Sequence, residues 1–349
     1  MEKKHRQSWA CLLTIICAAL LLGGCATASK SKTRVVWPPP PNTPRLEWVG
    51  TYSSLDQMPK SAMERMSQPI LGGQPELVFK RPFGIASAGD GRIFVSDADK
   101  RQITVYDLEK RAVYPFSQTS AIRSPFGLAM DSAGRLFVAD AASQAVLVFG
   151  PDDAPLFSFG GPEVLEHPTF LALDEARNKI YVSDARGHRV VVFDFQGKYL
   201  KSFGEWGPQD GNFYSPQGLA VDKAGNLYVA DMFNARVQVF DAEGKFLRKF
   251  GERGDTQSNF EMPKGLAIDS EGNLHITDAR KGAMVTYSPE GKSLLYTGGG
   301  KSSHPLDLIL PAGIWIDRND RIYVVDQIGR RFVVWQYLNA TYLKDHPLD

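Results

Sequence analysis

Six aspartates are the most regularly placed side chains in this chain that could do chemistry. Each one ends a short apolar run, and they stand at positions 97, 140, 184, 231, 278 and 326. A carboxylate can act as a general acid or base, or hold a metal ion, but one position that recurs six times cannot be six active sites. We therefore predict that these aspartates accept local backbone hydrogen bonds in the turn that follows each run.

Histidines are a second source of catalytic or metal-binding groups. Beyond residue 24 they stand at 167, 188, 275, 304 and 346, and no two have the spacing of metal ligands. His275 occupies a position where the other repeats have phenylalanine or tyrosine, which favours packing over ligation. His167 precedes a recurring proline, so a functional role stays open beside a surface or hydrogen-bonded one. No metal, other cofactor or catalytic residue is predicted.

A glycine-rich segment near the C-terminus resembles part of a phosphate-binding loop. Gly298-Gly-Gly-Lys-Ser302 matches the end of Gly-x-x-x-x-Gly-Lys-Ser, but the first glycine of that motif would fall on Leu295. We interpret the segment as a loop between strands. A Gly-x-Ser-x-Gly nucleophile elbow is also missing from the sequence.

The N-terminus has the order of a secretory signal. Three basic residues precede an apolar run from Trp9 to Leu22, which is too short to remain as a membrane span. Leu-Gly-Gly-Cys25 resembles a bacterial lipobox, which implies that Cys25 is acylated and becomes the mature N-terminus. The alternative is an ordinary signal peptide cut nearby. By the same resemblance, Ala26 favours the outer membrane, so the expected location is the cell envelope, facing the periplasm.

Cysteine content argues against a disulfide-stabilised protein, and net charge argues against a nucleic-acid-binding protein. Removal of residues 1–24 also removes Cys11 and Cys17, so no disulfide can form once Cys25 is acylated. The whole chain carries +1, and residues 1–24 contribute three basic and one acidic residue, which leaves the mature chain near −1. Nucleic-acid-binding proteins normally show a basic footprint, so nucleic acid is not expected as a partner.

The six aspartates belong to a repeated cassette that must position any functional side chain. From Pro216 one copy has Pro-Gln-Gly-Leu-Ala-Val-Asp, then Asn-Leu-Tyr-Val-Ala-Asp, then Arg-Val-Gln-Val-Phe-Asp. Apolar residues alternate with a period of two between Gly and Asp, which predicts short strands and tight turns, with Phe246–Gly251 as a fourth strand. Copies of this size predict a repeat array whose units bury each other's faces. Their prolines stand at 82, 125, 168, 216, 263 and 311.

The cassette resembles the NHL repeat. The shared pattern is Pro-x-Gly-[Leu/Ile]-Ala-x-Asp, then Gly-x-[Leu/Ile]-[Tyr/Phe]-Val-x-Asp, then Arg-[Val/Ile]-x-Val-Phe, and Gly204–Pro216 matches the family's glycine-rich connection. The family's Asn-x-Arg survives complete only at Asn234 and Arg236, and Ser87 replaces an aspartate. The resemblance covers residues 77–338 and implies an all-β, six-bladed β-propeller of four-stranded antiparallel blades, in a monomeric exported lipoprotein.

These patterns divide the chain into four parts. We expect a signal peptide at 1–24, a Pro-rich tether at 25–44, the propeller at 45–338 and a polar tail at 339–349. Residues 45–52 resemble an isolated fourth strand, so we predict a ring closed by an N-terminal strand, which removes two free sheet edges. A short helix is expected near Lys60–Met66.

In propellers of this family the first strand of each blade begins at one end of the central channel. The residues that flank the six prolines are therefore expected at that mouth, and none of the twelve is a carboxylate. Basic and aromatic residues in the turn between the second and third strands are expected on the same face, where they could form an interface. The alternative is a solvated face on which these charges are paired. The candidate binding face consists of Arg81, Phe83, Phe126, His167, Gln217, Phe233, Arg236 and Lys264.

Two classes of function remain open. The first is a non-catalytic binding or scaffold module for a protein, peptide or envelope polymer, attached to the membrane through Cys25. The alternative is a propeller enzyme, a lactonase-type hydrolase or an amidating-lyase-like protein, which analogy of fold permits. Such enzymes use metal-binding acids or histidines around the channel. A mouth lined by Phe83, Phe126 and Met262 favours the module, whereas acids converging with His167 favour the enzyme.

Overall fold

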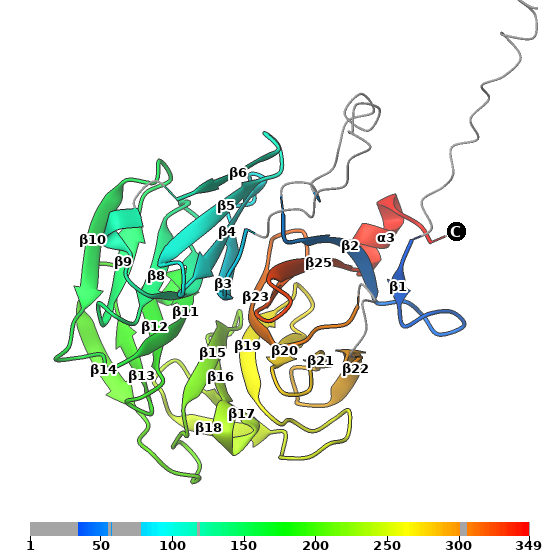
Figure 1. Ribbon diagram of the computed structural model, residues 1–349. Helices are drawn as coiled ribbons and strands as arrows, with labels where there is room; N and C mark the ends of the chain where they lie inside the picture. The colour runs from blue at the N-terminus through cyan, green and yellow to red at the C-terminus, as the bar shows by residue number, and fades with distance from the viewer. Residues whose placement is uncertain (1–33, 55–56, 58–77, 117–118, 301–305, 349) are drawn as a thin grey trace, which may run out of the picture. The chain divides into compact units, whose positions relative to one another are not determined.

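The computed structural model describes residues 34–54, 57, 78–116, 119–300 and 306–348. The chain separates into two compact units after Val35, and the unit from Val36 onward holds six antiparallel sheets arranged as the blades of a propeller (Figure 1). The predicted six-bladed, all-β architecture is confirmed.

Each of the first three blades is built from four consecutive strands. Blade 1 contains β3 (Pro82–Ser87), β4 (Arg92–Asp97), β5 (Gln102–Asp107) and β6 (Ala112–Pro115). Blade 2 contains β7 (Pro125–Met130), β8 (Leu136–Asp140), β9 (Ala145–Phe149) and β10 (Pro155–Gly160). Blade 3 contains β11 (Pro168–Asp174), β12 (Lys179–Asp184), β13 (Arg189–Phe193) and β14 (Tyr199–Phe203).

Blades 4 and 5 repeat this order, and blade 6 departs from it. Blade 4 contains β15 (Pro216–Val221), β16 (Leu227–Asp231), β17 (Arg236–Phe240) and β18 (Phe246–Phe250). Blade 5 contains β19 (Pro263–Ile268), β20 (Leu274–Asp278), β21 (Ala283–Tyr287) and β22 (Ser293–Gly298). Blade 6 combines β23 (Pro311–Ile316), β24 (Arg321–Asp326) and β25 (Arg331–Tyr337) with β2 (Leu46–Tyr52) from the N-terminal side.

The middle strands of a blade are buried on both faces, which explains their apolar residues on both sides. Every residue of β16 and β17 is buried, whereas the outer strand β18 alternates between half-buried and exposed. The hairpin that joins β15 to β16 has the chemistry expected from its sequence. The Asp222 carboxylate accepts the N–H of Asn226 at 2.8 Å, and Gly225 has a φ of 92°, which favours glycine.

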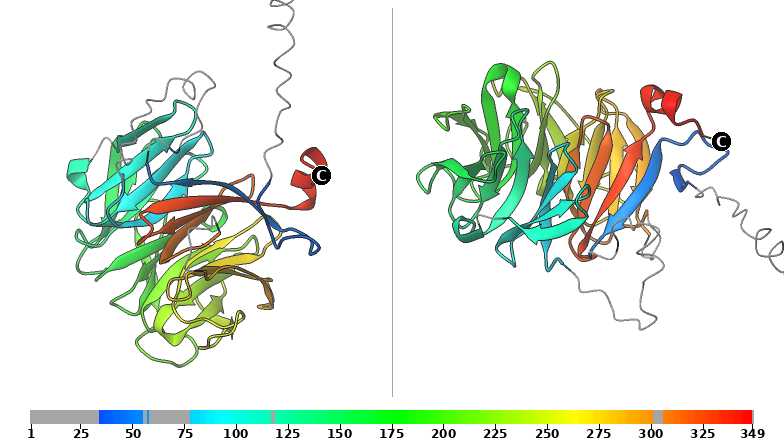
Figure 2. Two further views of the ribbon diagram at one scale, coloured as in Figure 1. Left: turned by 45° about the vertical axis from the view of Figure 1, so that its right-hand side comes forward. Right: turned by 90° about the horizontal axis from the view of Figure 1, so that it is seen from above.

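The strand β2 closes the ring, as predicted for residues 45–52. It pairs antiparallel with β25, with Trp48 opposite Trp335 and Thr51 opposite Val333, and the two lie side by side in both views of Figure 2. The innermost strands contact one another in order around the ring, including β23 with β3. The fully buried Trp335 packs at this junction. Because the last blade is completed by β2, the hydrogen-bonding edge of β25 is covered.

Two terminal segments differ from the sequence prediction. The tether predicted for 25–44 ends earlier, since Val36–Trp37 form the short strand β1, which pairs with β2. The Trp37 indole packs against the apolar core of blade 6 and donates to the carbonyl of Tyr296 at 2.8 Å. The predicted polar tail contains the helix α3 (Ala340–Asp345), whose N-cap Asn339 accepts the N–H of Tyr342 at 2.7 Å. The helix expected near Lys60–Met66 lies outside the described residues.

Candidate functional site

The six recurrent aspartates accept hydrogen bonds from the loops that lead into the first strand of each blade. The Asp97 carboxylate accepts the backbone N–H groups of Lys80 and Arg81, at 2.7 and 3.0 Å, and that of Lys100 at 3.0 Å. One aspartate therefore ties the turn after the second strand to the loop that leads into the first. All six are fully buried, and each accepts at least one N–H from the residues just before its blade's proline. The predicted hydrogen bond to a backbone N–H of the following turn is present at Asp97, Asp140, Asp278 and Asp326. Asp184 and Asp231 differ, since they accept from an arginine Nε beyond the turn. A structural role is therefore confirmed, although the predicted turn contact holds in four blades.

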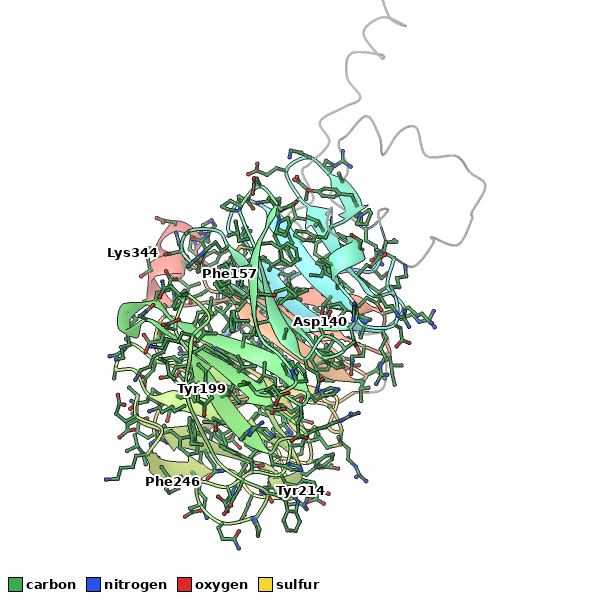
Figure 3. All side chains as sticks on the ribbon, turned by 90° about the vertical axis from the view of Figure 1, so that its left-hand side faces the viewer. Asp140, Phe157, Tyr199, Tyr214, Phe246 and Lys344 are labelled. Carbon is green, nitrogen blue, oxygen red and sulfur yellow. The ribbon has the colours of Figure 1, made fainter. Side chains whose placement is uncertain are left out.

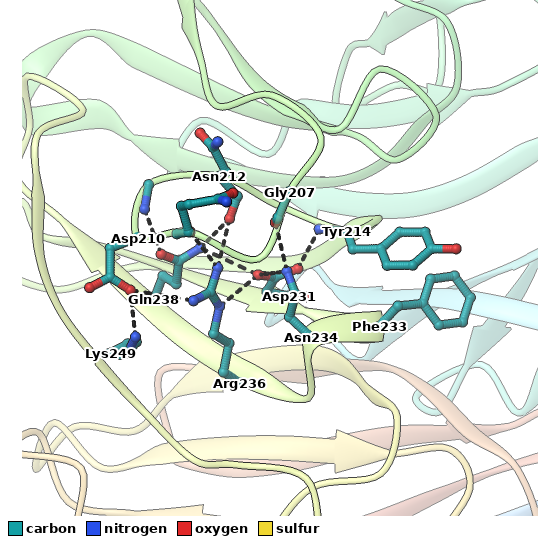
Figure 4. Close-up of polar contacts among 12 residues, drawn as sticks. Gly207, Asp210, Asn212, Tyr214, Asp231, Phe233, Asn234, Arg236, Gln238 and Lys249 are labelled. Carbon is teal, nitrogen blue, oxygen red and sulfur yellow. Dashed lines mark hydrogen bonds and ion pairs between the residues drawn. The ribbon is translucent and has the colours of Figure 1, made fainter.

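Blade 4 extends this arrangement into a larger polar network (Figure 4). The Asp231 carboxylate accepts the N–H of Tyr214 at 2.7 Å, the Asn234 amide at 2.8 Å and the Arg236 Nε at 2.9 Å. Burial raises the pKa of Asp231, against the opposing effect of these hydrogen bonds. Asn234 and Arg236 thus serve to hold a buried carboxylate.

Arg236 is a support for the candidate face and does not offer a free contact. Its side chain is buried, and Nη2 donates to the carbonyls of Gln209 and Asn212 at 2.8 and 2.9 Å. These bonds fix the long loop before β15. The guanidinium is fully engaged inside the protein, so its part in binding is to position that loop.

The residues that follow the prolines form a ring with one aromatic side. Phe83 lies 4.7 Å from Phe126 between ring centroids, and both pack with Ala312. Phe126 in turn meets the edge of the His167 ring at 5.2 Å. The structure therefore brings together the predicted residues Phe83, Phe126 and His167.

Phe170 belongs to this aromatic cluster and was missed in the sequence. It is buried, and its ring lies 5.2 Å from Phe83. The five other blades have glycine at this position, because a Cβ there would meet the next blade; on Gly265 it would lie 2.4 Å from the Ala312 carbonyl oxygen. The departure from glycine in blade 3 was the signal that could have found it.

The opposite side of the mouth is polar. Lys264 from β19 donates from Nζ to the Oε1 of Gln327 at 2.9 Å, and its Nζ lies 5.4 Å from the centre of the Phe83 ring. Removal from water, with a smaller contribution from the positive charge of Arg81, lowers the pKa of Lys264 to about 8. Gln217 occupies the corresponding position of blade 4, the neighbouring blade. It is buried, and its amide donates to the Ser215 hydroxyl at 3.1 Å.

His167 adds no positive charge to the mouth at neutral pH. Burial, followed by the charge of Arg186, lowers the pKa of its imidazole. Its backbone N–H donates to Asp184 at 2.7 Å, whereas its Nδ1 is buried without a hydrogen-bond partner in the described part of the chain. His275, in contrast, lies between Asp269 at 2.9 Å and Thr286 at 3.1 Å in the core of blade 5, so its predicted packing role is confirmed.

An exposed group of aromatic rings, which we call the aromatic arc, stands on the loops of blade 4. Tyr214 lies 4.9 Å from Phe233 and 6.2 Å from Trp206, and these three side chains are 43%, 42% and 65% exposed. Figure 3 shows Tyr214 projecting at the margin of the molecule, and Figure 4 shows its ring beside that of Phe233, both pointing away from the Asp231 network. His188 meets Tyr214 at 5.8 Å.

Some of the basic residues expected on this face are paired and some are not. Arg189 and Arg331 bind the aspartates of their own blades, at 3.2 and 3.1 Å, and Arg280 pairs with Glu261 at 2.9 Å. Arg186 and Arg330 are exposed. The expected basic face is therefore smaller than the sequence indicated, because the position after the turn is used to neutralise a buried carboxylate.

The central channel beneath the aromatic cluster is lined mainly by residues with apolar side chains, together with Glu175. This cavity of about 250 Å³ lies among the innermost strands of blades 2 to 6, and its lining includes Phe170 and Trp315. Trp315 replaces the alanine of the other cassettes and packs against the cores of three blade interfaces.

Neither a metal centre nor a membrane span is found in the part of the chain that the structure describes. There, no three His, Cys, Asp or Glu side chains are grouped so that they could hold a metal ion. No helix among the described residues is long and apolar enough to cross a bilayer. Gly298 ends β22, and residues 301–305 of the glycine-rich segment lie outside the description.

Two family models match parts of the sequence. One, described as an SMP-30/gluconolactonase/LRE-like region, matches residues 163–251, and one described as a 6-bladed beta-propeller matches residues 224–299. No curated protein matches the chain significantly.

Several solved structures share the fold. A catalytically inactive virginiamycin B lyase from Staphylococcus aureus, solved with quinupristin, is 14% identical with a TM-score of 0.57 over 77% of this chain and 86% of its own. A gluconolactonase from Xanthomonas campestris is 17% identical with a TM-score of 0.59 over 74% and 87%. A protein of unknown function from Bacteroides thetaiotaomicron is 16% identical with a TM-score of 0.62 over 82% and 75%. At these identities the likeness shows the fold alone.

Proposed function

We propose that this protein is a lipid-anchored, extracytoplasmic NHL-type propeller that binds a polypeptide partner, without catalysis, on the face that carries the cassette prolines. Cys25 would carry the acyl anchor in the outer membrane, and the propeller would face the periplasm. The observation that carries the proposal is the aromatic arc of Trp206, Tyr214 and Phe233.

The arc has the composition of an interface. Exposed tryptophan and tyrosine contribute most to binding energy in protein interfaces, together with arginine. Arg253, which lies in the next long loop, donates from Nη2 to the Phe233 carbonyl at 2.7 Å and so joins two blades at the arc. The rings stand on loops held by the buried Asp231 network, so little ordering entropy is lost when a partner binds.

Ring geometry favours a polypeptide over an envelope polysaccharide. Neighbouring rings of the arc are inclined by 55° and 71°, so they form a ridged surface. Ridges and hollows of this kind accept the separate side chains of a peptide. A polysaccharide partner would be recognised in the test below by a captured part that survives protease digestion of the adduct.

A second candidate function is a lactonase-type enzyme, and the match of residues 163–251 to the gluconolactonase-like model favours it. Against it, the mouth carries Phe83, Phe126 and Phe170 where converging donors would be needed to hold a metal ion. Hydrolysis of D-glucono-1,5-lactone by the full chain with added Ca²⁺ or Zn²⁺, abolished by substitution at the mouth, would replace the binding proposal.

The binding proposal is tested by photo-crosslinking in intact cells. A photoreactive amino acid at position 206 should give a discrete adduct whose captured part is degraded by protease. The same residue at position 223, on a turn between first and second strands, should give none. Phe233→Ala should reduce the adduct at least fivefold, since the arc loses its second ring. Leu294→Ala, which removes an apolar side chain of similar exposure (50%) from an outer strand, should leave it unchanged. Equal yields from 206 and 223 would refute the proposal.

A further inference from the structure

Lys264 lies across the channel mouth and has no counter-ion among the residues that the structure describes. It leaves blade 5, and because blade 6 contributes only Ala312 at the corresponding position, its ammonium reaches the Phe83 ring of blade 1 at 5.4 Å. Its hydrogen-bond acceptor is the neutral amide of Gln327, at 2.9 Å. An ammonium taken out of water without an opposite charge is costly to the protein.

The charges near Lys264 increase that cost. Arg81, which has the same sign, is the charged group that acts on it among the described residues. The nearest carboxylates along the chain are Glu261, which pairs with Arg280 at 2.9 Å, and Asp269, which lies 2.9 Å from the His275 Nε2. Asp326, next to Gln327, is bound to Arg331 at 3.1 Å and to the N–H of Leu310 at 3.0 Å. The mouth therefore has an excess of positive charge that an anion would neutralise.

The other half of the mouth is apolar. Phe83 lies between the Phe126 and Phe170 rings, at 4.7 and 5.2 Å, and also faces the Lys264 ammonium. Phe83 thus marks the boundary between an aromatic side and a cationic side. A ligand that contacts both must combine an apolar group with a negative charge over a distance of a few atoms.

We infer that the channel mouth is a binding site for a carboxylate carried on an apolar group, with Lys264 and Arg81 facing the carboxylate and the Phe83 and Phe126 rings contacting the apolar part. The inference deepens the proposed function and rests on it, since the site lies on the same face. Two sources share this chemistry, namely the C-terminal residue of a polypeptide and a free aromatic acid.

Other ligand classes fit this mouth less well. A phosphate group is strongly hydrated and is held in proteins by several N–H donors or by arginine forks, whereas half of this mouth is aromatic. A cation would be repelled by Lys264 and Arg81. A neutral apolar molecule would leave the Lys264 charge without a partner.

The test measures binding of matched acids and amides to the detergent-solubilised full chain at pH 7 by titration calorimetry. The probes are 3-phenylpropionate, 3-phenylpropionamide, and the peptide Ala-Ala-Ala-Ala-Phe with a free or an amidated C-terminus. Each acid should bind at least about tenfold more tightly than its amide, as a charge-assisted contact requires. A peptide acid that binds at least tenfold more tightly than 3-phenylpropionate identifies the polypeptide source, and equal affinities identify the free acid.

Matched variants assign the effect to the mouth. Lys264→Met should reduce affinity for both acids at least tenfold, and Arg81→Gln, at an exposed side chain, should reduce it about threefold. Lys223→Met removes the same charge from an exposed turn and should change nothing. Acids and amides that bind alike, or a Lys264→Met variant with unaltered affinity, would overturn the inference.

The two proposals fail separately. If the acids do not bind while the crosslink from position 206 persists, the mouth site is wrong and the binding function stands. If neither acid binding nor crosslinking occurs, the proposed function fails as well.

Discussion

Replacing Lys264 by methionine should stabilise the protein at neutral pH. Burial, and then Arg81, lower the pKa of Lys264 from 10.5 to about 8. Below pH 8 the lysine is protonated in both the folded and the unfolded chain, so the folded state bears the cost of this half-buried charge. The pKa difference of 2.5 between the unfolded and folded chain, at about 1.4 kcal/mol per pKa unit, lowers the free energy of unfolding by about 3 kcal/mol. Lys264→Met removes this cost but also loses the hydrogen bond to Gln327, which stabilises the wild type by about 1 kcal/mol. The variant should therefore be more stable by about 2 kcal/mol.

The sign of this effect should change with pH. Between pH 8 and 10.5 the unfolded chain binds a proton that the folded chain has released, so the stability of the wild type rises with pH relative to the variant. Above pH 10.5 both states are neutral, and Lys264→Met should be less stable by about 1 kcal/mol, since only the lost hydrogen bond remains.

Urea unfolding of the full chain, followed by tryptophan fluorescence from pH 7 to 11 at constant ionic strength, measures the difference. The matched control is Lys223→Met, at an exposed lysine, which should differ from wild type by less than about 0.5 kcal/mol at every pH. A Lys264→Met protein that is less stable than wild type at pH 7, or a difference that does not vary with pH, would refute the reasoning about the uncompensated charge.

Three further changes have defined outcomes. Cys25→Ser should move the protein from the membrane fraction to the soluble periplasmic fraction, because its acyl anchor is lost; unchanged fractionation would contradict the lipobox assignment. Asp326→Ala should lower the free energy of unfolding by about 3–5 kcal/mol, since it leaves the Arg331 Nε and three backbone N–H groups without their acceptor. Asp345→Ala on the exposed terminal helix should cost less than about 0.5 kcal/mol in the same urea titration. Phe170→Gly should restore the repeat's glycine, cost about 3 kcal/mol and admit a small fluorescent apolar dye to the channel; failure of the dye to enter would mean that Phe170 does not close the cavity.

The architecture was predictable because the sequence of each blade determines its own strands and turns. The alternation of apolar residues and the turn pairs such as Asp222 with Gly225 fix the strands locally. Six copies then fix the number of blades. The closing strand was predictable from residues 45–52 because its pattern matches an outer strand that blade 6 otherwise lacks. The strand at Val36–Trp37 was not, since the prolines around it favour an extended tether and its stability depends on a distant carbonyl, that of Tyr296.

The site was only partly predictable, for a similar reason. Phe83, Phe126, His167 and Lys264 lie close together because their spacing from the cassette prolines fixes their position in the ring. Arg236 has an equally clear sequence signal, but that signal reports the buried Asp231 carboxylate and its loop. A sequence pattern gives the position of a basic residue, whereas its freedom to bind depends on which carboxylate lies within reach in three dimensions.

The positions at which the six cassettes differ give this propeller its specific features. Five blades have glycine two residues after the cassette proline, because their backbones pack closely against the next blade there. Blade 3 has Phe170 at this position. Repetition also tolerates any residue just after the proline, and blade 5 uses that freedom for Lys264 while blade 6 has the small Ala312 that lets it cross. The two choices act on stability in opposite directions, because Phe170 adds apolar contacts in the channel, whereas the Lys264 ammonium loses hydration. A residue such as Lys264, which costs stability in a repeat protein, is retained where it meets something outside the repeat, and at this mouth Phe83 contacts both Lys264 and Phe170.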